Sequence, residues 1–358
     1  MSNAECLQIM SEFRIDPLSR KGVIIAGERA HRPFSQSCNA QTTACPFCKG
    51  NEEQTPSATD VVYYPGTNDW TLRCVPNKYP AVSPSLPWSE LEFQLSAGTD
   101  SFYNMTRQAA CGRHEVIIES PRHDKRCGLL GEEQWKRLTR VYAFKLRSFY
   151  EDQSCQYVQL FKNQGIVAGA SLEHVHSQIV GLPMVPPAVQ NELANLERYA
   201  SKTGRLFWTD ILNKELQLGK RIVETTENFI VFCPFLSRFS GETWIMPREA
   251  RPDMENVSNA VLDELGALLS RFLPRLENAL MAFNSQSTPT NCEPITPSYN
   301  VVYRTAPRIG GRIPELFCWR IEIIPRINAL AGFELGTGYT INVLPPEEFR
   351  DMLLNSKS

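Results

Sequence analysis

Residues 161–183 read FKNQGIVAGASLEHVHSQIVGLP and hold two of the five histidines of the chain within three positions. A glycine-rich polar run opens this segment, and His174, His176 and Gln178 follow at alternate positions. In a strand, alternate residues lie on one face, so we expect these three side chains to lie together beside a glycine-rich turn. Two imidazoles and an amide placed in this way suit the binding of a phosphate and an attack on it. A core strand with two incidental histidines is the alternative.

The composition is that of an ordinary globular protein, with 21% charged and 42% hydrophobic residues. The formal net charge of -2 gives no broad attraction for nucleic acid or for an anionic membrane, so we expect neither as a partner. No apolar run approaches the roughly eighteen residues that span a bilayer, and we expect no secretory leader. The eleven scattered cysteines are an odd number, which argues against a disulfide framework and predicts a reducing, cytoplasmic setting.

Hydrophobic periodicity predicts helices and strands in a regular order. Apolar residues recur at helical spacing over 132–150 and again over about 259–283, where we expect Pro274 to kink the helix. A shorter helix is predicted from Pro186-Pro187 to near Gly204. Short apolar runs predict strands at 22–26, which is expected to be buried, and at 72–75, 115–119, 156–161, 229–233, 242–246, 299–303 and 319–324.

The order strand, turn, strand, helix, strand, strand therefore occurs twice. We predict an α+β fold of two similar halves, each an antiparallel sheet with a long helix packed on one face. The first half covers residues 1–187 and the second residues 188–358. No histidine follows His176, so we expect any histidine chemistry to belong to the first half. Residues 83–113, rich in Pro, Ser and Gly, look like a long insertion.

The pair Cys45-x-x-Cys48 has the spacing of a zinc knuckle, because two thiolates two residues apart can each reach one tetrahedral ion. One such pair supplies half of a site. His123, at a strand end, and His174 are the natural candidates for the other two ligands, which would give a closed, structural site. One alternative is a redox-active pair, which usually lies at the start of a helix. The other is two thiols without a function.

If the metal takes His174, His176 requires a separate role. A neutral imidazole is a good nucleophile toward phosphorus and can form a phosphoramidate. Gln178, on the same face, can donate a hydrogen bond to a phosphate oxygen. The run Gly169-Ala170-Ser171 offers backbone N–H groups and a hydroxyl to the same anion. The sequence has neither a G-x-S-x-G elbow nor a Walker motif, which excludes those two mechanisms.

These motifs together resemble those of a known family. Residues 161–183 are similar to the active-site segment of the galactose-1-phosphate uridylyltransferase family, a branch of the histidine-triad superfamily of nucleotidyl transferases. The resemblance extends in order over nearly the whole chain, through the segments GVIIAGERAHRPF, CPFCKGNE, LRCVPNKYPA, HEVIIESPRHD and AGFELGTGY. It implies a ping-pong transfer, in which His176 attacks the α-phosphorus of a nucleotide-sugar and hexose 1-phosphate leaves. A second phosphate substrate, a sugar phosphate or inorganic phosphate, then takes the nucleotidyl group.

The same resemblance implies roles for individual residues and a homodimer. The implied zinc ligands are Cys45, Cys48, His123 and His174. The positions implied near the nucleotide are Arg29, Arg32 and Asn77, and those implied near the phosphates are Asn163, Gly169, Ser171 and Gln178. Phe333 and Glu334 fall in a C-terminal segment that, in this family, helps to complete the sugar-phosphate site, often across the homodimer.

The sequence departs from the family pattern in three ways. Val175 stands where the family often has proline, which leaves the strand alternation unchanged. The second half has no histidines for a second metal. The segment 332–338 resembles the ADP-glucose phosphorylase branch, which adenylylates inorganic phosphate. We expect hexose-1-phosphate uridylyl transfer, with ADP-glucose phosphorolysis as the alternative. A non-catalytic nucleotide-binding protein and a dinucleotide hydrolase are further alternatives.

Overall fold

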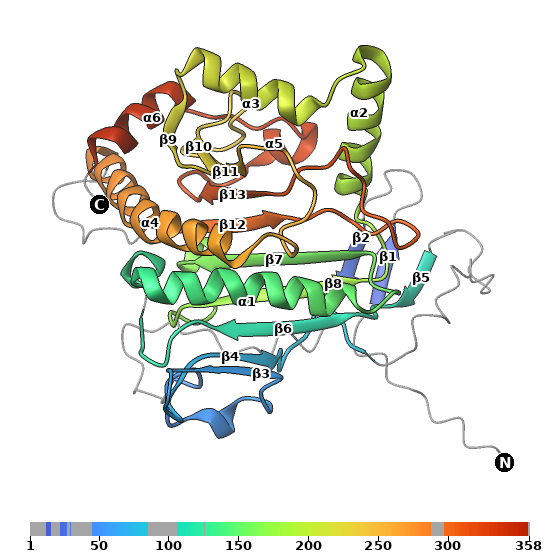
Figure 1. Ribbon diagram of the computed structural model, residues 1–358, viewed down its shortest axis with the longest axis vertical. Helices are drawn as coiled ribbons and strands as arrows, with labels where there is room; N and C mark the ends of the chain where they lie inside the picture. Colours follow the sequence, from blue (N-terminus) through green and yellow to red (C-terminus); the bar gives the residue numbers. More distant parts are fainter. Residues whose placement is uncertain are drawn as a thin grey trace.

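The computed structural model describes residues 12–15, 22–26, 29, 45–84, 106–124, 126–287 and 297–356. Ten strands of these ranges form one antiparallel sheet that runs through the molecule (Figure 1). Every strand predicted in this sheet from the sequence overlaps an observed one. From one edge to the other, the strands are β3 (Asp60–Tyr63), β4 (Trp70–Pro76), β6 (Arg113–Ile118), β8 (His176–Leu182), β7 (Tyr157–Gln164), β12 (Tyr299–Arg304), β13 (Arg320–Pro325), β11 (Thr243–Pro247), β10 (Phe229–Phe232) and β9 (Ile222–Thr225).

Two long helices lie side by side on one face of this sheet, α1 (Glu132–Tyr150) and α4 (Asn259–Ser287) (Figure 1). The Thr139 hydroxyl donates to the carbonyl of Leu262 across the helix pair at 2.8 Å. α4 continues as one helix through Pro274. The predicted apolar stripe of α1 is buried, and it comprises Trp135, Leu138, Tyr142, Leu146 and Phe149. The α+β class is confirmed, with helices packed on an antiparallel sheet.

The two halves use the same strand order, and they meet in the middle of the sheet. β3, β4, β6, α1, β7 and β8 follow one another in the first half, as β9, β10, β11, α4, β12 and β13 do in the second. In both, the last strand of the half lies between the third and fourth strands. β7 pairs with β12, with Asn163 opposite Asn300, so a single sheet joins the halves. The division between residues 187 and 188 stays a prediction.

The first predicted strand differs from expectation. β2 (Gly22–Ile25) is a strand, but it lies in a separate three-stranded sheet with β1 (Glu12–Ile15) and β5 (Thr106–Ala109). Its burial was wrongly predicted, because the side chain of Val23 is 53% exposed and that of Ile25 is 40% exposed. β5 belongs to the expected insertion at 83–113, of which residues 85–105 lie outside the described ranges.

Smaller helices complete the fold. α2 (Pro187–Thr203) begins and ends where the sequence predicted, and Gly204 supplies the left-handed residue after it, with φ of 68°. The sequence did not predict three further helices, α3 (Phe207–Leu218), α5 (Gly332–Thr337) and α6 (Pro346–Asn355).

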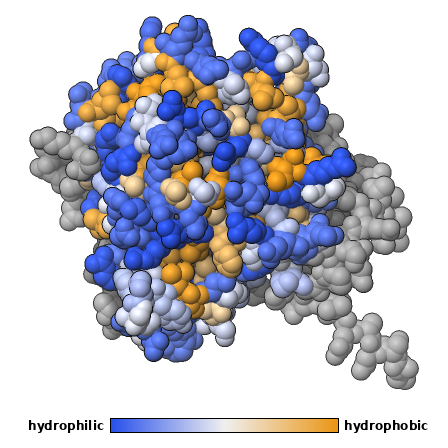
Figure 2. Space-filling view, viewed as in Figure 1, coloured by the Kyte–Doolittle hydropathy of each residue, from blue (hydrophilic) through white to orange (hydrophobic). Residues whose placement is uncertain are grey.

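In the described part of the chain, no helix combines the length and the apolarity required to cross a membrane. In the view of Figure 1, mostly polar residues cover the visible surface, with smaller apolar areas between them (Figure 2).

The crossing of α1 and α4 depends on a glycine. A Cβ atom on Gly266 would lie 2.6 Å from the backbone nitrogen of Lys136 and 2.7 Å from its Cα. Backbone atoms cannot swing aside, so we expect Gly266→Ala to lower the free energy of unfolding by about 2 kcal/mol despite the better helix propensity of alanine. Urea denaturation measures this loss. Gly336→Ala in α5, where a Cβ meets nothing within 4 Å, is the matched control and should cost nothing. Equal effects of the two substitutions would contradict the close helix contact.

Candidate active site and metal centre

Two thiols and two imidazoles converge at one end of the histidine segment. The ligand atoms of Cys45, Cys48, His123 and His174 all lie within 4.8 Å of one another. Nδ1 of His174 is 3.6 Å from both sulfurs, and Nδ1 of His123 is 3.4 Å from Sγ of Cys48. Around a tetrahedral ion with ordinary metal–sulfur and metal–nitrogen bonds, neighbouring sulfur and nitrogen ligands lie about 3.5 Å apart. The four residues therefore form a group that can bind a metal ion.

The protonation state of His174 suits a ligand. Burial lowers the pKa of His174 to about 4, so its imidazole is neutral at physiological pH, as a coordinating imidazole must be. Nε2 of His174 lies 2.9 Å from the carbonyl oxygen of Ser120. A carbonyl only accepts, so Nε2 carries the proton and Nδ1 presents its lone pair to the sulfurs. This is the outer hydrogen bond that commonly orients a metal-binding histidine.

Backbone hydrogen bonds hold the loops that carry the four ligands. The backbone N–H of Lys49, next to the cysteine pair, donates to the carbonyl of Pro121 at 3.0 Å. The N–H of Val175 donates to the carbonyl of Asp124 at 2.9 Å, and the side chain of Asp124 accepts from the Ser120 hydroxyl at 2.6 Å. The turn after β6 is thus attached to both the cysteine loop and the histidine segment. Residues far apart in sequence are brought together by this turn.

The start of β8 corrects one detail of the sequence prediction. The strand begins at His176, so the strict alternation of side chains holds for His176 and Gln178, and His174 precedes the ladder. His174 and His176 nevertheless contact one aromatic ring. The ring of Phe47, inside the cysteine loop, lies edge-on to both, with centroid distances of 5.9 Å and 5.3 Å. The loop of the cysteine pair therefore reaches both histidines.

His176 is held in one tautomer. Its Nδ1 lies 2.8 Å from the carbonyl oxygen of His174, and the side chain is 7% exposed. Because the carbonyl oxygen can only accept, Nδ1 carries the proton and the lone pair of the neutral ring is on Nε2. A lone pair fixed in direction by a backbone acceptor is the form in which an imidazole acts as a nucleophile.

The side chain of Gln178 contacts two residues, of which one was overlooked in the sequence. Its Oε1 lies 3.3 Å from Nδ2 of Asn77, a residue assigned to the nucleotide region, and 3.1 Å from Nε2 of His114. His114, on β6, had no assigned role, because no other candidate residue lies at a recognisable spacing from it. Its proximity to Gln178 arises from the pairing of β6 with β8, which no local sequence pattern reveals.

The glycine-rich loop between β7 and β8 is tied to the same region. Gly165 and Gly169 have positive φ angles of 81° and 88°, which glycine adopts without strain. Asn300 of β12 donates through Nδ2 to Oδ1 of Asn163 at 2.9 Å and to the carbonyl of Ala168 at 2.8 Å. The second half thereby fixes the loop that carries the expected phosphate-binding positions Gly169, Ala170 and Ser171.

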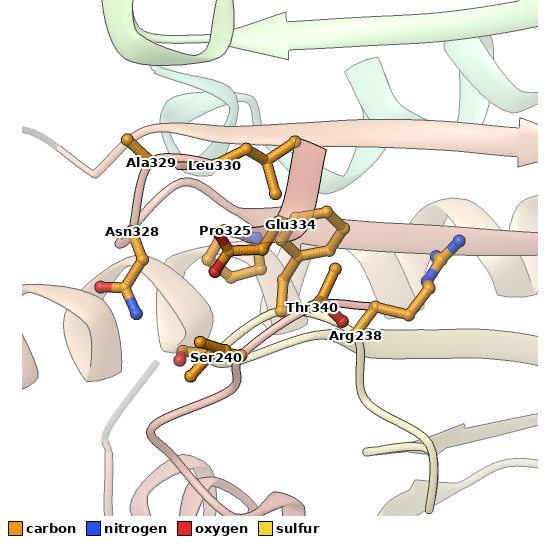
Figure 3. A pocket seen from close by; sticks show the side chains of 10 residues that line it. Arg238, Ser240, Pro325, Asn328, Ala329, Leu330, Glu334 and Thr340 are labelled. Carbon is orange, nitrogen blue, oxygen red and sulfur yellow. The ribbon is translucent and has the colours of Figure 1, made fainter. Parts of the chain in front are cut away.

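The remaining predicted positions are distributed differently. Arg29 donates through Nη1 to the carbonyl of Tyr79, two residues from Asn77. Arg32 lies outside the described residues. Phe333 and Glu334 belong to α5, where Phe333 is 54% exposed and Glu334 accepts from the N–H of Ala331 at 3.0 Å. Figure 3 shows Glu334 in a small pocket that is lined by Arg238, Phe239, Ser240, Pro325, Asn328, Ala329, Leu330, Glu334, Thr340 and Ile341. Neither the histidines nor Gln178 line this pocket.

The chain is similar to known enzymes along most of its length. The chain is 29% identical to ADP-glucose phosphorylase of Arabidopsis thaliana over 346 residues, which covers 94% of this chain and 90% of that protein. It is 23% identical to galactose-1-phosphate uridylyltransferase of Thermotoga maritima, covering 95% of this chain and 96% of that protein. The crystal structure of the Arabidopsis thaliana ADP-glucose phosphorylase with bound ADP-glucose superposes with a TM-score of 0.70 at 27% identity, over 97% of this chain and all of that one.

A solved uridylyltransferase structure is similar to the same degree, with a TM-score of 0.72 and 26% identity over 96% of this chain and 97% of that one. The fold and the relatives together define the chain as an enzyme of the nucleotidyltransferase class. The family model described as galactose-1-phosphate uridyl transferase, N-terminal domain, matches residues 3–186, which is more than half of the chain. The protein belongs to the galactose-1-phosphate uridyl transferase family.

The four-residue group predicts a bound metal. We expect the purified protein to carry about one metal ion per chain, and the double substitution Cys45→Ala and Cys48→Ala to remove it, because two imidazoles alone hold the ion weakly. Elemental analysis by mass spectrometry measures the content. Cys155→Ala, which deletes a buried thiol outside the group, is the control and should leave the metal in place. Metal retained by the double variant would contradict the site.

Proposed function

We propose that the protein transfers a nucleoside monophosphate from a nucleotide-sugar to a phosphate acceptor through a nucleotidyl group on His176. The observation that carries this proposal is the hydrogen bond from Nδ1 of His176 to the carbonyl of His174, at 2.8 Å. It gives the ring a lone pair on Nε2 in a fixed direction. The neighbouring Gln178 and the glycine-rich loop supply donors of the kind that bind a phosphate.

The transfer proceeds in two displacements. Nε2 attacks the α-phosphorus, a nitrogen–phosphorus bond forms, and the bond to the bridging oxygen breaks so that hexose 1-phosphate leaves with the electron pair. The ring is then cationic, and its Nδ1–H continues to donate to the carbonyl of His174, which stabilises the charge. An oxygen of the acceptor phosphate attacks the same phosphorus, the nitrogen–phosphorus bond breaks, and the neutral imidazole returns. The amide of Gln178 donates to a non-bridging oxygen in both steps.

We propose zinc as the metal, held by Cys45, Cys48, His123 and His174. Thiolate and imidazole ligands in a tetrahedral set favour zinc over the harder cations. Four protein ligands close the coordination shell, so the ion would fix the conformation of the segment before His176. A closed site of this kind stabilises structure. In this role the metal supports the direction of the His174 carbonyl and takes no part in either displacement.

Two donor and acceptor pairs are candidates. Uridylyl transfer to a hexose 1-phosphate is supported by the family model and by the Thermotoga maritima uridylyltransferase, which matches along nearly the whole chain. ADP-glucose phosphorolysis, in which inorganic phosphate accepts an adenylyl group, is favoured by the higher identity of 29% to the Arabidopsis thaliana phosphorylase. The nucleophile and the metal group are the same in both, so the two candidates differ in base and acceptor alone.

We further propose a cytoplasmic homodimer. The cysteines of the described ranges are all free thiols, which suits a reducing compartment. The segment around α5 exposes apolar side chains to solvent, which is unfavourable unless another surface covers them. Leu335 is 70% exposed, Tyr339 75% and Val343 61%. A second copy of the chain would cover this segment, to which Phe333 and Glu334 belong.

Labelling of the protein tests the nucleophile. We expect incubation with ADP-glucose or UDP-glucose, labelled in the nucleotide and without acceptor, to give a labelled protein that loses the label in acid, as a phosphoramidate does. His176→Ala should give no label while keeping its metal, because His176 lies outside the four-residue group. Gln178→Ala should slow labelling about a hundredfold, the usual effect of losing one transition-state donor. Labelling of His176→Ala at the normal rate would exclude this nucleophile.

Acceptor preference separates the two candidates. The labelled protein, freed of nucleotide-sugar, is divided between galactose 1-phosphate and inorganic phosphate. A uridylyltransferase transfers its label to the sugar phosphate and gives UDP-galactose. A phosphorylase transfers it to inorganic phosphate and gives ADP. Chromatography of the products decides between the two outcomes.

Light scattering tests the proposed dimer independently of the chemistry. We expect light scattering to give twice the chain mass of 40.6 kDa, and Leu335→Glu to shift the protein toward the monomer. Glu197→Gln, on the exposed face of α2, is the control and should remain dimeric. A wild-type protein that scatters as a monomer at micromolar concentration would contradict the dimer and leave the chemistry of His176 untouched.

A further inference from the structure

We infer that His114 is a positioning residue that sets which end of the Gln178 amide faces the phosphate. The inference rests on the proposed function, since it gives Gln178 its role as a donor to the transferred phosphoryl group. The side-chain oxygen and nitrogen of a glutamine differ by a rotation of half a turn, and only the nitrogen can donate to an anion. Some feature of the protein must therefore select one of the two orientations.

The tautomer of His114 is determined by the backbone. Its ring is 6% exposed, and Nδ1 accepts a hydrogen bond from the backbone N–H of Ala81 at 3.0 Å. A backbone N–H can only donate, so Nδ1 has no proton and the neutral ring carries its proton on Nε2. Nε2 is the atom that lies 3.1 Å from Oε1 of Gln178. His114 is therefore a donor toward Gln178.

Asn77 reaches the same oxygen and is oriented in the same way. Its Oδ1 accepts from the backbone N–H of Tyr79 at 2.9 Å, which turns Nδ2 toward Gln178. The backbone N–H of Asn77 also donates to the carbonyl of His114 at 2.9 Å and holds the two residues together. Two backbone donors in one loop, at Tyr79 and Ala81, thus set the orientation of two side chains that both face Gln178.

Two donors converge on one acceptor. Nδ2 of Asn77 and Nε2 of His114 lie 3.0 Å apart, and neither can bond to the other because both carry protons. An acceptor shared between them relieves this contact, and Oε1 of Gln178 fills that position. The opposite orientation would place three donors together in a site where Gln178 is 8% exposed. Leaving buried donors unsatisfied in this way costs on the order of 1–3 kcal/mol for each group.

The consequence concerns the other end of the amide. With Oε1 occupied by His114 and Asn77, the amide nitrogen of Gln178 is a fixed donor on the strand face that also carries His176, two residues earlier. A donor whose direction is set before the substrate arrives needs no reorientation in the transition state, and such preorganised donors are the effective ones. The reversed amide would present an oxygen to the phosphate and repel it.

The tautomers can be measured without any substrate. With only five histidines in the chain, selective ¹⁵N labelling and long-range nitrogen–proton NMR resolve the protonated nitrogen of each ring. We expect Nε2–H in His114 and Nδ1–H in His176, and substitution of each histidine assigns its signals. Finding the proton on Nδ1 of His114 would overturn the inference, whatever the enzyme transfers.

A double-mutant cycle tests the catalytic consequence. The rate of nucleotidyl-protein formation is measured in a single turnover, together with nucleotide-sugar affinity. We expect His114→Phe to slow labelling by about ten- to a hundredfold, with less than a threefold change in affinity. His114→Gln, whose amide can place a donor near the position of Nε2, should recover most of the rate. In a Gln178→Ala background, His114→Phe should slow labelling less than twofold further, since residues that act as a unit are not additive.

Several outcomes would overturn the inference. If His114→Phe and Gln178→Ala multiply in the double variant, His114 acts independently of Gln178. If His114→Gln is as slow as His114→Phe, the ring contributes by packing. Wild-type protein that takes no label from either nucleotide-sugar contradicts the proposed function instead, and the tautomer measurement then still decides whether His114 orients Gln178.

Discussion

The carbonyl oxygen of His174 is the acceptor on which the candidate nucleophile depends. His176 lies inside the ladder of β8, where strand pairing fixes its backbone, but His174 precedes the strand and has no such support. The Val175 N–H, which belongs to the same peptide unit as the His174 carbonyl, donates to the carbonyl of Asp124 and supplies it instead, together with the Cys/His group and the hydrogen bond to the Ser120 carbonyl. A rotation of the His174 peptide would remove the acceptor from Nδ1 of His176 and with it the direction of the lone pair on Nε2. The Cys/His group, which lies beside His176, thereby helps to set the geometry of the candidate nucleophile.

The back of the same strand carries a buried polar cluster that holds it against α1. Ser177 faces the helix, and the hydroxyl of Tyr142 lies 2.8 Å from both Oγ of Ser177 and Oε1 of Glu119. Lys162 of β7 forms an ion pair with Glu119, and its Nζ also lies 3.4 Å from the carbonyl of His176. Charges without access to water are tolerated when partners satisfy them, and such a cluster tolerates little displacement. β8 is therefore constrained on both faces, by the cluster behind and by the metal group and Gln178 contacts in front.

The sequence predicted some parts of this arrangement better than others. The difference depends on how far apart in the chain the interacting residues lie. α1 was predicted with its correct bounds because its helical period is a local signal over 132–150. The four metal-binding candidates were reached from residue types and order, and the structure brings their ligand atoms within 4.8 Å of one another. The joining of two sheets into one was not predicted, because the pairing of Asn163 with Asn300 brings together strands 137 residues apart. His114 was missed for the same reason. The exposure of β2 was not predicted, because burial depends on what packs against a strand.

The corresponding sheet faces of the two halves carry different kinds of side chain. In β13 of the second half, Ile321 and Ile323 pack toward α4 as Ile179 of β8 packs toward α1, so Arg320 and Glu322 occupy the face that carries His176 and Gln178 in the first half. There the charges are internally neutralised. Arg320 binds Glu322 at 2.9 Å and Glu192 of α2 at 2.8 Å.

Helices α2 and α3, in the segment that links the halves, contribute side chains that cover part of this second face. The guanidinium of Arg320 lies 4.5 Å from the ring centroid of Trp208 in α3 and 5.0 Å from that of Trp244, which excludes water and strengthens the ion pairs. The guanidinium of Arg320 already binds two carboxylates and stacks on two indole rings, so it is not available to a phosphate. In the first half, the corresponding residues are His176 and Gln178. The backbone N–H groups of Tyr79 and Ala81 orient Asn77 and His114, the two side chains that contact Gln178. Side chains with preset directions can bind the negative charge of a phosphate, whereas a closed cluster of ion pairs would have to be broken first. Because the side chains of the second half are already paired, the proposed chemistry is assigned to the half that carries His176.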